Sequence, residues 1–350
     1  MFYLDACTEL TEFLHPYADE LYYEFDKLPL NLGAMYLIGR EQLRLNSDRV
    51  RSMCEQCQIV FANPAEGSET LVWHLRRYGV EDLVLAGKIK LIGGGRMPPE
   101  YKYMLFEHFL TQPFRYDENR QACSRTPEIF SLAEKPYSFL CLNGRGRPHR
   151  YAIINELEKF GLLDRALWTN LDDHLRPIRL LPTHYEVDRY RANTVQSGYV
   201  KSQLFNNEWG EIYIKPEPYI DTYFSLVTET VYSYPWSLFS EKISKPLAIG
   251  HPWIAVANTG FYRDLRNLGF QTFHSIIDES FDAIDNNQDR MDRIVDTVRD
   301  LCSQNLVAFL AAAEPICKYN QQHLQQFADQ HMAALPARFF QYIHDEHERS

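Results

Sequence analysis

The first half of the chain alternates short apolar runs with polar, amphipathic segments. The apolar runs predict strands at 20–25, 58–64 and 88–95, the last of which ends in three glycines. Segments 40–57 and 68–79 place apolar residues at helical spacing and predict helices. Strands that alternate with helices in this way favour a parallel, doubly wound sheet.

A polar, irregular stretch at 115–135 interrupts the alternation, which then starts again. Segment 101–114, just before it, predicts one more helix. Segment 171–219 has little periodicity and predicts short helices and loops, and the chain from about 275 predicts a helical tail. Between these segments we expect strands at 137–144, 165–170, 221–230 and 252–258, and helices at 151–163, 240–250 and 262–270.

The predicted fold class is α/β, with two Rossmann-like domains and a helical C-terminal tail. A chain of 350 residues is longer than one hydrophobic core usually organises. We place the N-terminal domain at 1–130, the second domain at 131–275 and the tail at 276–350. Open α/β sheets bind ligands beyond the carboxyl ends of their strands, so we expect a site in a cleft between the two domains.

Composition and charge narrow the classes of function. The chain has 36 basic and 47 acidic side chains, which give a net charge of −11. This negative charge disfavours nucleic acid or an anionic membrane as the main binding partner. No apolar run approaches the roughly 20 residues of a membrane helix. Seven cysteines without a disulfide-like pattern, and an acidic residue near the start instead of the basic ones of a secretory signal, predict a cytoplasmic protein.

Unusual residues follow the strands of the predicted second domain. Parallel strands bring their carboxyl ends to one edge of the sheet, so we expect these residues to converge there. Several cationic groups, a helix N-terminus and two carboxylates suit an anion that carries hydroxyls, such as a nucleoside diphosphate. The residues are Arg145, Arg147, His149 and Arg150 after 137–144, Glu229 at the end of 221–230, and Ser240, Glu241 and Lys242 at the start of 240–250.

Lys242 raises a question of its own, because a lysine in the first turn of a helix faces the positive end of the helix dipole. A bound diphosphate between the lysine and the dipole would explain it. Each residue also has a simpler explanation. The arginine-rich stretch 145–150 is also typical of a solvated turn, Glu241 of a first-turn partner of the dipole, and Lys242 of a surface residue.

The segments "FSLVTET", "FSEKISKPLAIGHPWI" and "LRNLGF" resemble the donor-binding region of the fucosyltransferases and their bacterial and phage relatives. "FLCLNGRGRPHR" resembles the start of the donor domain in that family, and "FHSIIDESFDAI" resembles a segment of the bacterial and phage relatives. The resemblance spans roughly 137–300. The sequence departs from the family where Thr230 and Val231 replace Asn-Ser, and where an aromatic, proline-containing loop precedes "SEK".

The resemblance implies a GT-B fold, an N-terminal acceptor domain and a C-terminal domain that binds a nucleotide-sugar donor. It implies phosphate contacts for Arg150 and Lys242 and a ribose contact for Glu241, and Glu229 matches the strand-end glutamate of the family. The donor-binding candidates taken together are Asn143, Arg147, Arg150, Glu229, Ser240, Glu241 and Lys242. The expected activity is an inverting glycosyltransferase that acts on a glycan or a similar hydroxyl acceptor.

Inverting transfer requires a base for the acceptor hydroxyl, and a carboxylate of the first domain is the expected one. Glu66 and Glu69 both follow the strand at 58–64. We favour Glu66, because Glu69 falls in the first turn of the next helix, where a capping role also explains it. The alternative interpretation, that Glu66 and Glu69 are both acidic residues at the start of a helix and have no catalytic role, is equally supported. Gly93, Gly94 and Gly95 either let the backbone approach the acceptor or form a tight turn.

No metal or other cofactor is expected. Asp172 and Asp173 form an acidic pair of the kind that binds divalent metal in other glycosyltransferases, but nothing in their spacing supports a site. Cys54 and Cys57 lack the second pair of ligands that zinc requires. Two alternatives to the enzyme stay open: a non-catalytic nucleotide-sugar-binding module, and a phage-type glycosyltransferase of hydroxymethylated DNA bases, with Arg76, Arg77, Lys88, Lys90 and Arg96 as a local basic channel.

Overall fold

The computed structural model describes residues 1–131, 134–143, 146–170 and 213–345. The chain divides into two compact units. Unit 1 comprises residues 1–108, 236–238 and 329–350, and unit 2 comprises 109–235 and 239–328. Each unit is described by itself below.

Unit 1 contains a six-stranded sheet in the order β2-β1-β3-β4-β5-β6, in which all neighbouring strands run parallel. The strands are β1 (Phe2–Asp5), β2 (Glu20–Tyr22), β3 (Met35–Ile38), β4 (Gln58–Asn63), β5 (Ile89–Gly93) and β6 (Tyr103–Leu105). The helices are α1 (Thr11–Leu14), α2 (Arg40–Met53), α3 (Ser68–Arg77) and α4 (Glu81–Leu85), with 3-10 turns η1 (His15–Tyr17) and η2 (Phe25–Lys27).

Both faces of this sheet are buried, which explains why its strands are apolar at nearly every position. Successive residues of a strand point to opposite faces, and they join two separate hydrophobic clusters. Tyr36 and Ile59 belong to one cluster, and their chain neighbours Leu37 and Val60 belong to the other. The second cluster also contains Leu335, Phe339 and Ile343 from the end of the chain.

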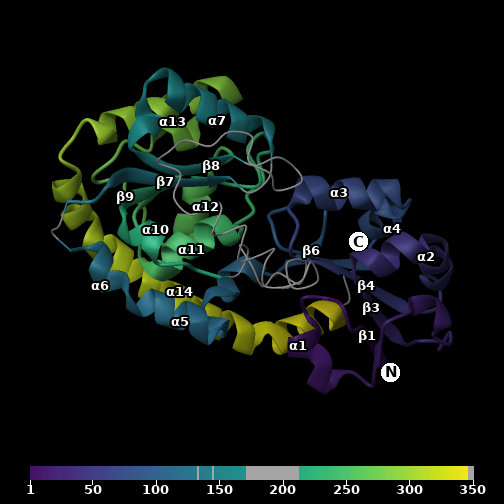
Figure 1. Cartoon of the computed structure of the whole chain (residues 1–350). Helices are drawn as coiled ribbons and strands as arrows, with labels where there is room; N and C mark the ends of the chain where they lie inside the picture. The colour runs from purple at the N-terminus through teal and green to yellow at the C-terminus, as the bar shows by residue number, and fades with distance from the viewer. Residues whose placement is uncertain (132–133, 144–145, 171–212, 346–350) are drawn as a thin grey trace, which may run out of the picture. The chain divides into compact units, whose positions relative to one another are not determined.

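Unit 2 contains a four-stranded parallel sheet in the order β10-β9-β7-β8. In Figure 1, α7 and α13 lie above this sheet and α10 and α11 below it. The strands are β7 (Tyr137–Asn143), β8 (Ala166–Asn170), β9 (Thr222–Thr228) and β10 (Trp253–Val256). The helices are α5 (Asp117–Ser124), α6 (Thr126–Ile129), α7 (Pro148–Lys159), α10 (Glu217–Ile220), α11 (Glu241–Ile249), α12 (Phe261–Asn267) and α13 (Asn287–Cys302), with 3-10 turns η4 (Pro113–Arg115), η5 (Leu162–Arg165) and η6 (Ser280–Ala283).

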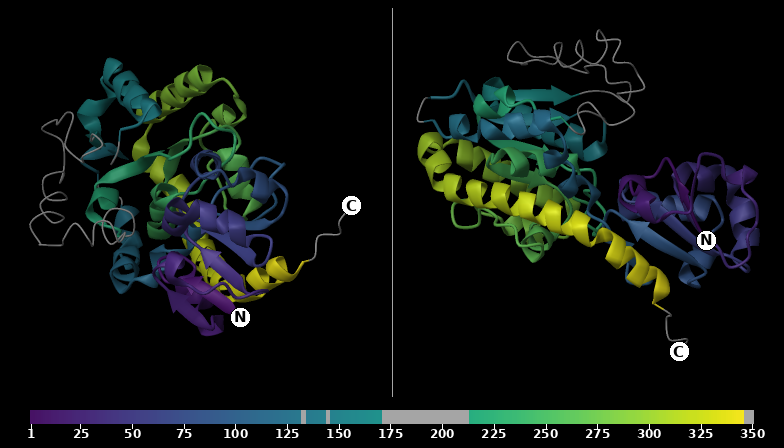
Figure 2. Two further views of the ribbon diagram at one scale, coloured as in Figure 1. Left: turned by 90° about the vertical axis from the view of Figure 1, so that its right-hand side faces the viewer. Right: turned by 90° about the horizontal axis from the view of Figure 1, so that it is seen from below.

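The last helix, α14 (Leu306–His344), belongs to both units: its residues up to 328 are part of unit 2 and the rest are part of unit 1. Figure 2 shows it as one long continuous helix. Its C-terminal end is fixed by Lys90 of β5, whose Nζ donates hydrogen bonds to the carbonyl oxygens of Tyr342 at 2.6 Å and Ile343 at 2.9 Å. A cation at this position satisfies carbonyl groups that the helix leaves unpaired.

The expected α/β class, two parallel sheets and a helical C-terminal region are confirmed. The helix expected at 101–114 is wrong. Its first part pairs with β5 as strand β6, and the 3-10 turn η3 (His108–Thr111) follows. Pro113 cannot donate a helical hydrogen bond, so the apolar pattern there does not become an α-helix. The first segment of unit 1 ends at His108, and unit 2 begins at Phe109, within the expected N-terminal domain of 1–130.

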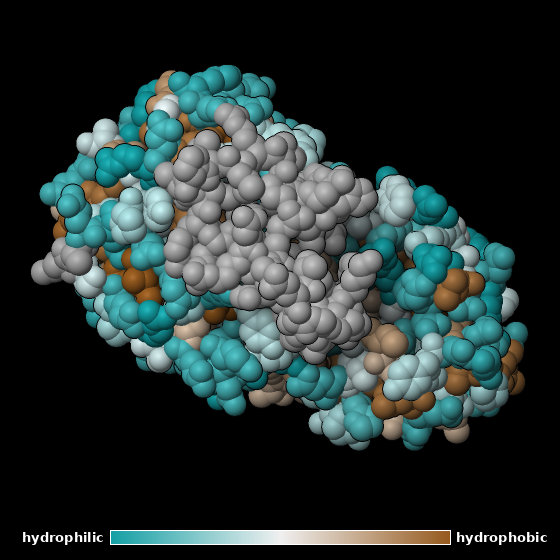
Figure 3. Space-filling view, viewed as in Figure 1, coloured by the Kyte–Doolittle hydropathy of each residue, from teal (hydrophilic) through white to brown (hydrophobic). Residues whose placement is uncertain are grey.

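In the described part of the chain, no helix is both long and apolar enough to cross a membrane. On the face drawn in Figure 3, hydrophobic side chains of the described residues reach the surface in separate patches surrounded by hydrophilic ones. Segment 171–212, most of the stretch expected to form short helices and loops, lies outside the described residues.

Candidate functional site

The strand order of unit 2 identifies one edge of its sheet as the place for a ligand. From β7 the chain continues to β8 on one side of β7, whereas β9 and β10 lie on the other side. The connection that leaves the carboxyl end of β7 therefore runs toward β8, and the one that leaves the carboxyl end of β9 runs the opposite way, toward β10. Doubly wound sheets bind ligands at such a reversal of strand order, because the two loops separate there and leave a crevice.

The residues that follow β7 are tied to the end of β9. Arg147 is the N-cap residue of α7, and its side chain makes no capping hydrogen bond to the helix. Arg150, in the first turn, is only 2% exposed, and its Nη2 donates to the carbonyl oxygens of Thr228 at 3.1 Å and Glu229 at 3.4 Å. His149 Nε2 lies 2.9 Å from the same Glu229 carbonyl. A carbonyl only accepts, so this ring nitrogen carries the proton.

The side chain of Glu229 joins the end of β9 to the start of α11. It is fully buried, and its Oε2 accepts hydrogen bonds from the Ser240 hydroxyl at 2.6 Å and the Thr230 amide at 2.9 Å. Its Oε1 accepts from the amides of Ser240 at 3.3 Å and Ile243 at 3.2 Å. Ser240 Oγ also caps the helix by accepting from the Lys242 amide at 3.2 Å. The N-terminus of α11 is thus already occupied by a carboxylate of the protein itself.

Glu241 and Lys242 form an ion pair at the first turn of α11. Their side chains are 15% and 21% exposed, so the pair lies at the surface of the site and is mostly shielded from water. The Lys242 ammonium also lies 3.5 Å from Thr230 Oγ1. In this structure Glu241 is therefore the negative group that offsets a lysine at the positive end of the helix dipole.

The electrostatic environment of this edge is positive. Burial, together with the charge of Arg147, lowers the pKa of Arg150 to about 10, while the charges of Glu241 and Glu229 oppose the change. Arg150 is still protonated at neutral pH. Burial also lowers the pKa of His149 to about 4, with smaller contributions from Arg150, Arg147 and Lys242. His149 is therefore a neutral imidazole at physiological pH, stacked on the ring of Tyr232 at 5.2 Å.

The two buried carboxyl groups respond differently to the same surroundings. Burial raises the pKa of Glu229, and this effect outweighs the opposing influence of Lys242 and the Ser240 hydrogen bond. Burial acts in the same direction on Glu241, but the charge and hydrogen bond of Lys242, with the charge of Lys245, lower the pKa of Glu241 overall. Glu241 is therefore ionised at neutral pH.

The structure brings together the donor-binding candidates of the sequence in unit 2: Asn143, Arg147, Arg150, Glu229, Ser240, Glu241 and Lys242. Arg145, Asp172 and Asp173 lie outside the described residues. Sequence reasoning missed two strand-end residues beside Asn143. Thr228, the last residue of β9, donates a hydrogen bond from its hydroxyl to Asn143 Oδ1, and Asn170, the last residue of β8, is paired in register with Asn143. The sequence could have pointed to both residues, because each is polar and lies at the end of a predicted strand of the same sheet.

Glu66 lies in unit 1, after β4 and before α3, where its Oε1 is 3.4 Å from Arg40 Nη1. The order of strands reverses in this unit too, since β2 lies on one side of β1 and β3 on the other. Arg40 starts α2, which follows β3, and Glu9 follows β1. Burial raises the pKa of Glu9, and the charges of Glu66 and Asp5 raise it further. Glu66 therefore lies among other charged groups near the carboxyl edge of its sheet.

Gly94 has a structural role beside that position. A Cβ built on it would lie 1.6 Å from the carbonyl oxygen of Pro64, a contact between backbone segments that no side chain can relieve. Gly94 therefore allows a close approach of the two loops that follow β4 and β5.

Cys54 and Cys57 do not resemble a metal centre. Their thiols lie 3.1 Å and 3.3 Å from the carbonyl oxygens of Val50 and Asn31, and burial raises the pKa of both. Within the described ranges no group of three or more His, Cys, Asp or Glu side chains could hold a metal ion.

Neither a protein-family model nor a curated protein sequence matches this chain.

Proposed function

We propose that unit 2 binds a nucleoside diphosphate sugar and that the protein transfers the sugar to a hydroxyl acceptor such as a glycan. The observation that carries the proposal is that Arg147, Arg150, Glu241 and Lys242 follow the two strands at which the strand order reverses, β7 and β9. A pyrophosphate needs cationic donors, and a ribose offers hydroxyls to a carboxylate.

In this proposal the pyrophosphate lies at the N-terminus of α7. That helix has 12 residues and its N-cap residue, Arg147, makes no side-chain cap, whereas Glu229 already occupies the N-terminus of α11. Arg147 and Lys242 contact phosphate oxygens, and Arg150 contributes its charge while holding the end of β9. Glu241 stays ionised and accepts hydrogen bonds from the ribose. Glu229 and Ser240 position the first turn of α11, and with it Glu241 and Lys242.

The proposed reaction is transfer with inversion. The acceptor oxygen forms a bond to the anomeric carbon of the sugar, and the bond between that carbon and the diphosphate oxygen breaks. The electron pair of the broken bond leaves with the nucleoside diphosphate, whose charge the cations stabilise. The proton of the acceptor hydroxyl goes to Glu66, the proposed base of unit 1. These roles require neither a metal nor another cofactor.

The proposed family is the GT-B glycosyltransferases that resemble fucosyltransferases, supported by the sequence segments around β7, β9 and α11. The parallel α/β sheets of both units are consistent with Rossmann-like domains. The acceptor domain of the proposal is unit 1, which carries Glu66.

Thermal-shift measurements with UDP, GDP, ADP and dTDP test the binding step, since a ligand that prefers the folded state raises the melting temperature. We expect a shift with at least one nucleotide, and a loss of about tenfold or more in its affinity in Lys242→Ala. Lys159→Ala is the control, because Lys159 is exposed and pairs only locally with Glu156. No shift with any nucleotide, or equal affinity of both variants, would contradict the proposal.

Release of nucleoside diphosphate from the matching nucleotide-sugar tests the chemical step. Binding without release, in the presence of a panel of glycan acceptors, would favour a nucleotide-sugar-binding module instead of an enzyme.

A further inference from the structure

Two asparagines end neighbouring strands at the carboxyl edge of the sheet of unit 2. Asn143 is the last residue of β7 and is paired in register with Asn170, the last residue of β8. Residues paired in this way place their side chains on the same face of a parallel sheet. Asn143 is fully buried and Asn170 is 7% exposed, so both amides lie inside the protein.

One end of the Asn143 amide is bonded to β9, on the other side of β7. The Thr228 hydroxyl donates to Asn143 Oδ1, which places the Nδ2 group at the other end of the amide. The main chain of Asn143 is also held, because its amide donates to Thr169 Oγ1 at 2.7 Å. With Oδ1 accepting from Thr228, the amide presents its Nδ2 donor at the opposite end.

The remaining amide atoms have no partner. Asn143 Nδ2 and Asn170 Oδ1 are both buried and make no hydrogen bond in the part of the chain that the structure describes. One is a donor and the other an acceptor, on adjacent strand ends. Buried polar groups in proteins are nearly always paired, so a donor and an acceptor left open side by side indicate a place for a ligand group.

Asn320 shows what a purely structural buried asparagine looks like in the same unit. Its Oδ1 accepts from the Gln271 amide at 2.8 Å, and its Nδ2 donates to the Gln271 carbonyl at 2.8 Å. Both ends of this amide are satisfied within the protein. An open amide atom, as in Asn143 and Asn170, is therefore not shared by every buried asparagine of unit 2.

We propose that Asn143 Nδ2 and Asn170 Oδ1 bind one hydroxyl group of the sugar of the donor. This inference rests on the proposed function. A hydroxyl group accepts one hydrogen bond and donates another, which matches this pair of atoms. The proposed pyrophosphate site lies between β7 and β9, with the ribose at Glu241 after β9. Since β8 lies on the opposite side of β7 from β9, the far end of the diphosphate, which carries the sugar, lies toward Asn170.

The experiment separates recognition of the sugar from recognition of the nucleotide. Dissociation constants are measured for UDP and GDP and for UDP-glucose, UDP-N-acetylglucosamine, GDP-mannose and GDP-fucose, with wild type and Asn170→Ala. For the donor that binds, we expect the variant to bind the free nucleotide as wild type does and to bind the nucleotide-sugar about tenfold more weakly.

Asn143→Asp is the second variant, because it keeps the shape of the side chain and replaces the Nδ2 donor with an acceptor. We expect the same selective loss. Asn320→Ala is the matched control, since it removes a buried asparagine of the same unit and lowers stability without changing the ratio of the two dissociation constants.

If Asn170→Ala and Asn143→Asp both leave that ratio within twofold of wild type, the pair holds an ordered water or nothing, and the inference is overturned while the proposed function stands. If the affinity for the free nucleotide falls as much as that for the nucleotide-sugar, the pair contacts the nucleotide and the inference is also overturned. If no nucleotide binds to wild type, the proposed function fails and the inference fails with it.

Discussion

The carboxylate of Glu229 accepts a hydrogen bond from the Ser240 hydroxyl at 2.6 Å, and the two residues come from the end of β9 and the start of α11. This bond replaces the water or ligand that would otherwise meet the first turn of α11. The same bond determines the positions of the charged side chains of the next two residues, Glu241 and Lys242. The hydrogen bond between Glu229 and Ser240 therefore positions two residues of the proposed donor site without contacting the ligand itself.

We expect Ser240→Ala to lower the free energy of unfolding by about 2–3 kcal/mol. The variant loses a helix N-cap, worth about 1 kcal/mol, and leaves a buried carboxylate short of one hydrogen bond, which costs about 1–3 kcal/mol. Urea denaturation followed by circular dichroism measures the change. Ser303→Ala is the control, because the exposed Ser303 hydroxyl bonds only to Asp300 in its own helix end. Equal losses in the two variants would show that the contact with Glu229 contributes nothing.

Glu66 and Glu69 provide a matched pair for the proposed base. We expect Glu66→Gln to lose at least about a hundredfold in sugar transfer while its affinity for the donor stays unchanged, because general-base catalysis contributes 10²–10⁴-fold. Glu69→Gln should stay within a few-fold of wild type, since Glu69 lies in the first turn of α3. Nucleoside diphosphate release measures turnover. Full activity of Glu66→Gln would show that Glu66 is not the base. A loss of sugar transfer in Glu69→Gln alone would assign the role of the base to Glu69.

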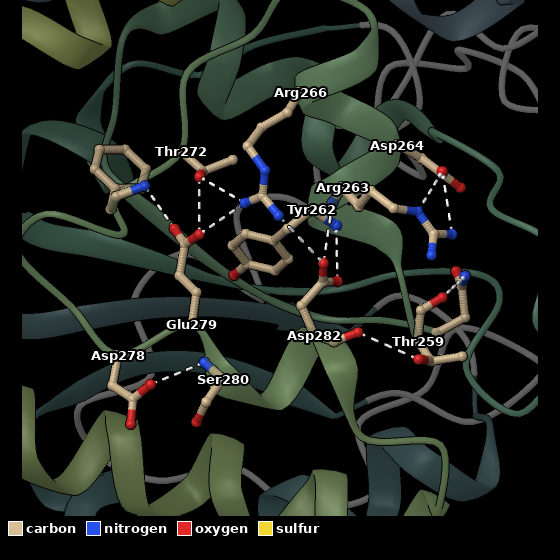
Figure 4. A network of polar contacts seen from close by, with 12 residues as sticks. Thr259, Tyr262, Arg263, Asp264, Arg266, Thr272, Asp278, Glu279, Ser280 and Asp282 are labelled. Carbon is tan, nitrogen blue, oxygen red and sulfur yellow. Dashed lines mark hydrogen bonds and ion pairs between the residues drawn. The ribbon is translucent and has the colours of Figure 1, made fainter.

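Glu279 lies in a network of polar contacts that holds the segment after α12 (Figure 4). Its Oε2 accepts from the Thr272 hydroxyl at 2.8 Å and lies 3.0 Å from Arg266 Nη1. The side chain is only 6% exposed. Burial raises the pKa of Glu279 from 4.5 to about 7, against the opposing hydrogen bonds from Thr272 and Phe273 and the charge of Arg266.

This shift predicts a pH dependence of stability. The folded-state pKa lies above the unfolded one, so the folded protein holds an extra proton between pH 4.5 and about 7. The stabilisation is complete below pH 4.5 and is lost as the pH rises through the folded-state pKa. It amounts to about 3 kcal/mol.

Glu279→Gln cannot titrate, which isolates the contribution of this group. Relative to wild type, its free energy of unfolding should rise by about 3 kcal/mol between acidic and mildly alkaline pH. Denaturation curves at several pH values give the difference directly. A difference that does not change with pH would mean that Glu279 keeps its ordinary pKa in the folded protein.

Gly94→Ala tests the close approach of the two loops after β4 and β5. The new Cβ would meet the Pro64 carbonyl oxygen at 1.6 Å, so one of the two loops must move. We expect a loss of stability of about 3 kcal/mol or more, in the range of overpacking and strain. Gly79→Ala is the comparison, since it has a φ of 65° and open space around it, and should cost about 1 kcal/mol. Similar losses in both would show that the contact at Gly94 yields easily.

The sequence by itself determined the longer local elements and the set of polar residues at the second sheet. Runs such as 58–64 and 137–144 are apolar at nearly every position because both faces of a parallel strand are buried, and this pattern is local. Ser240 before Glu241 likewise marks the start of α11, because helix capping depends on neighbours in the chain. The positions of Arg147, Glu229 and Lys242 after strands followed from the same pattern.

Only the tertiary structure decided what those residues do to one another. The short strands β1 and β3 have four residues each, too few for a reliable period, and their identity comes from pairing in the sheet. The sequence could not show that Glu229 fills the N-terminus of α11, or that Asn143 meets Thr228 and Asn170, because these contacts join residues 11, 85 and 27 positions apart. Hydrogen bonds between distant strands depend on register, and register is fixed by packing across the whole sheet.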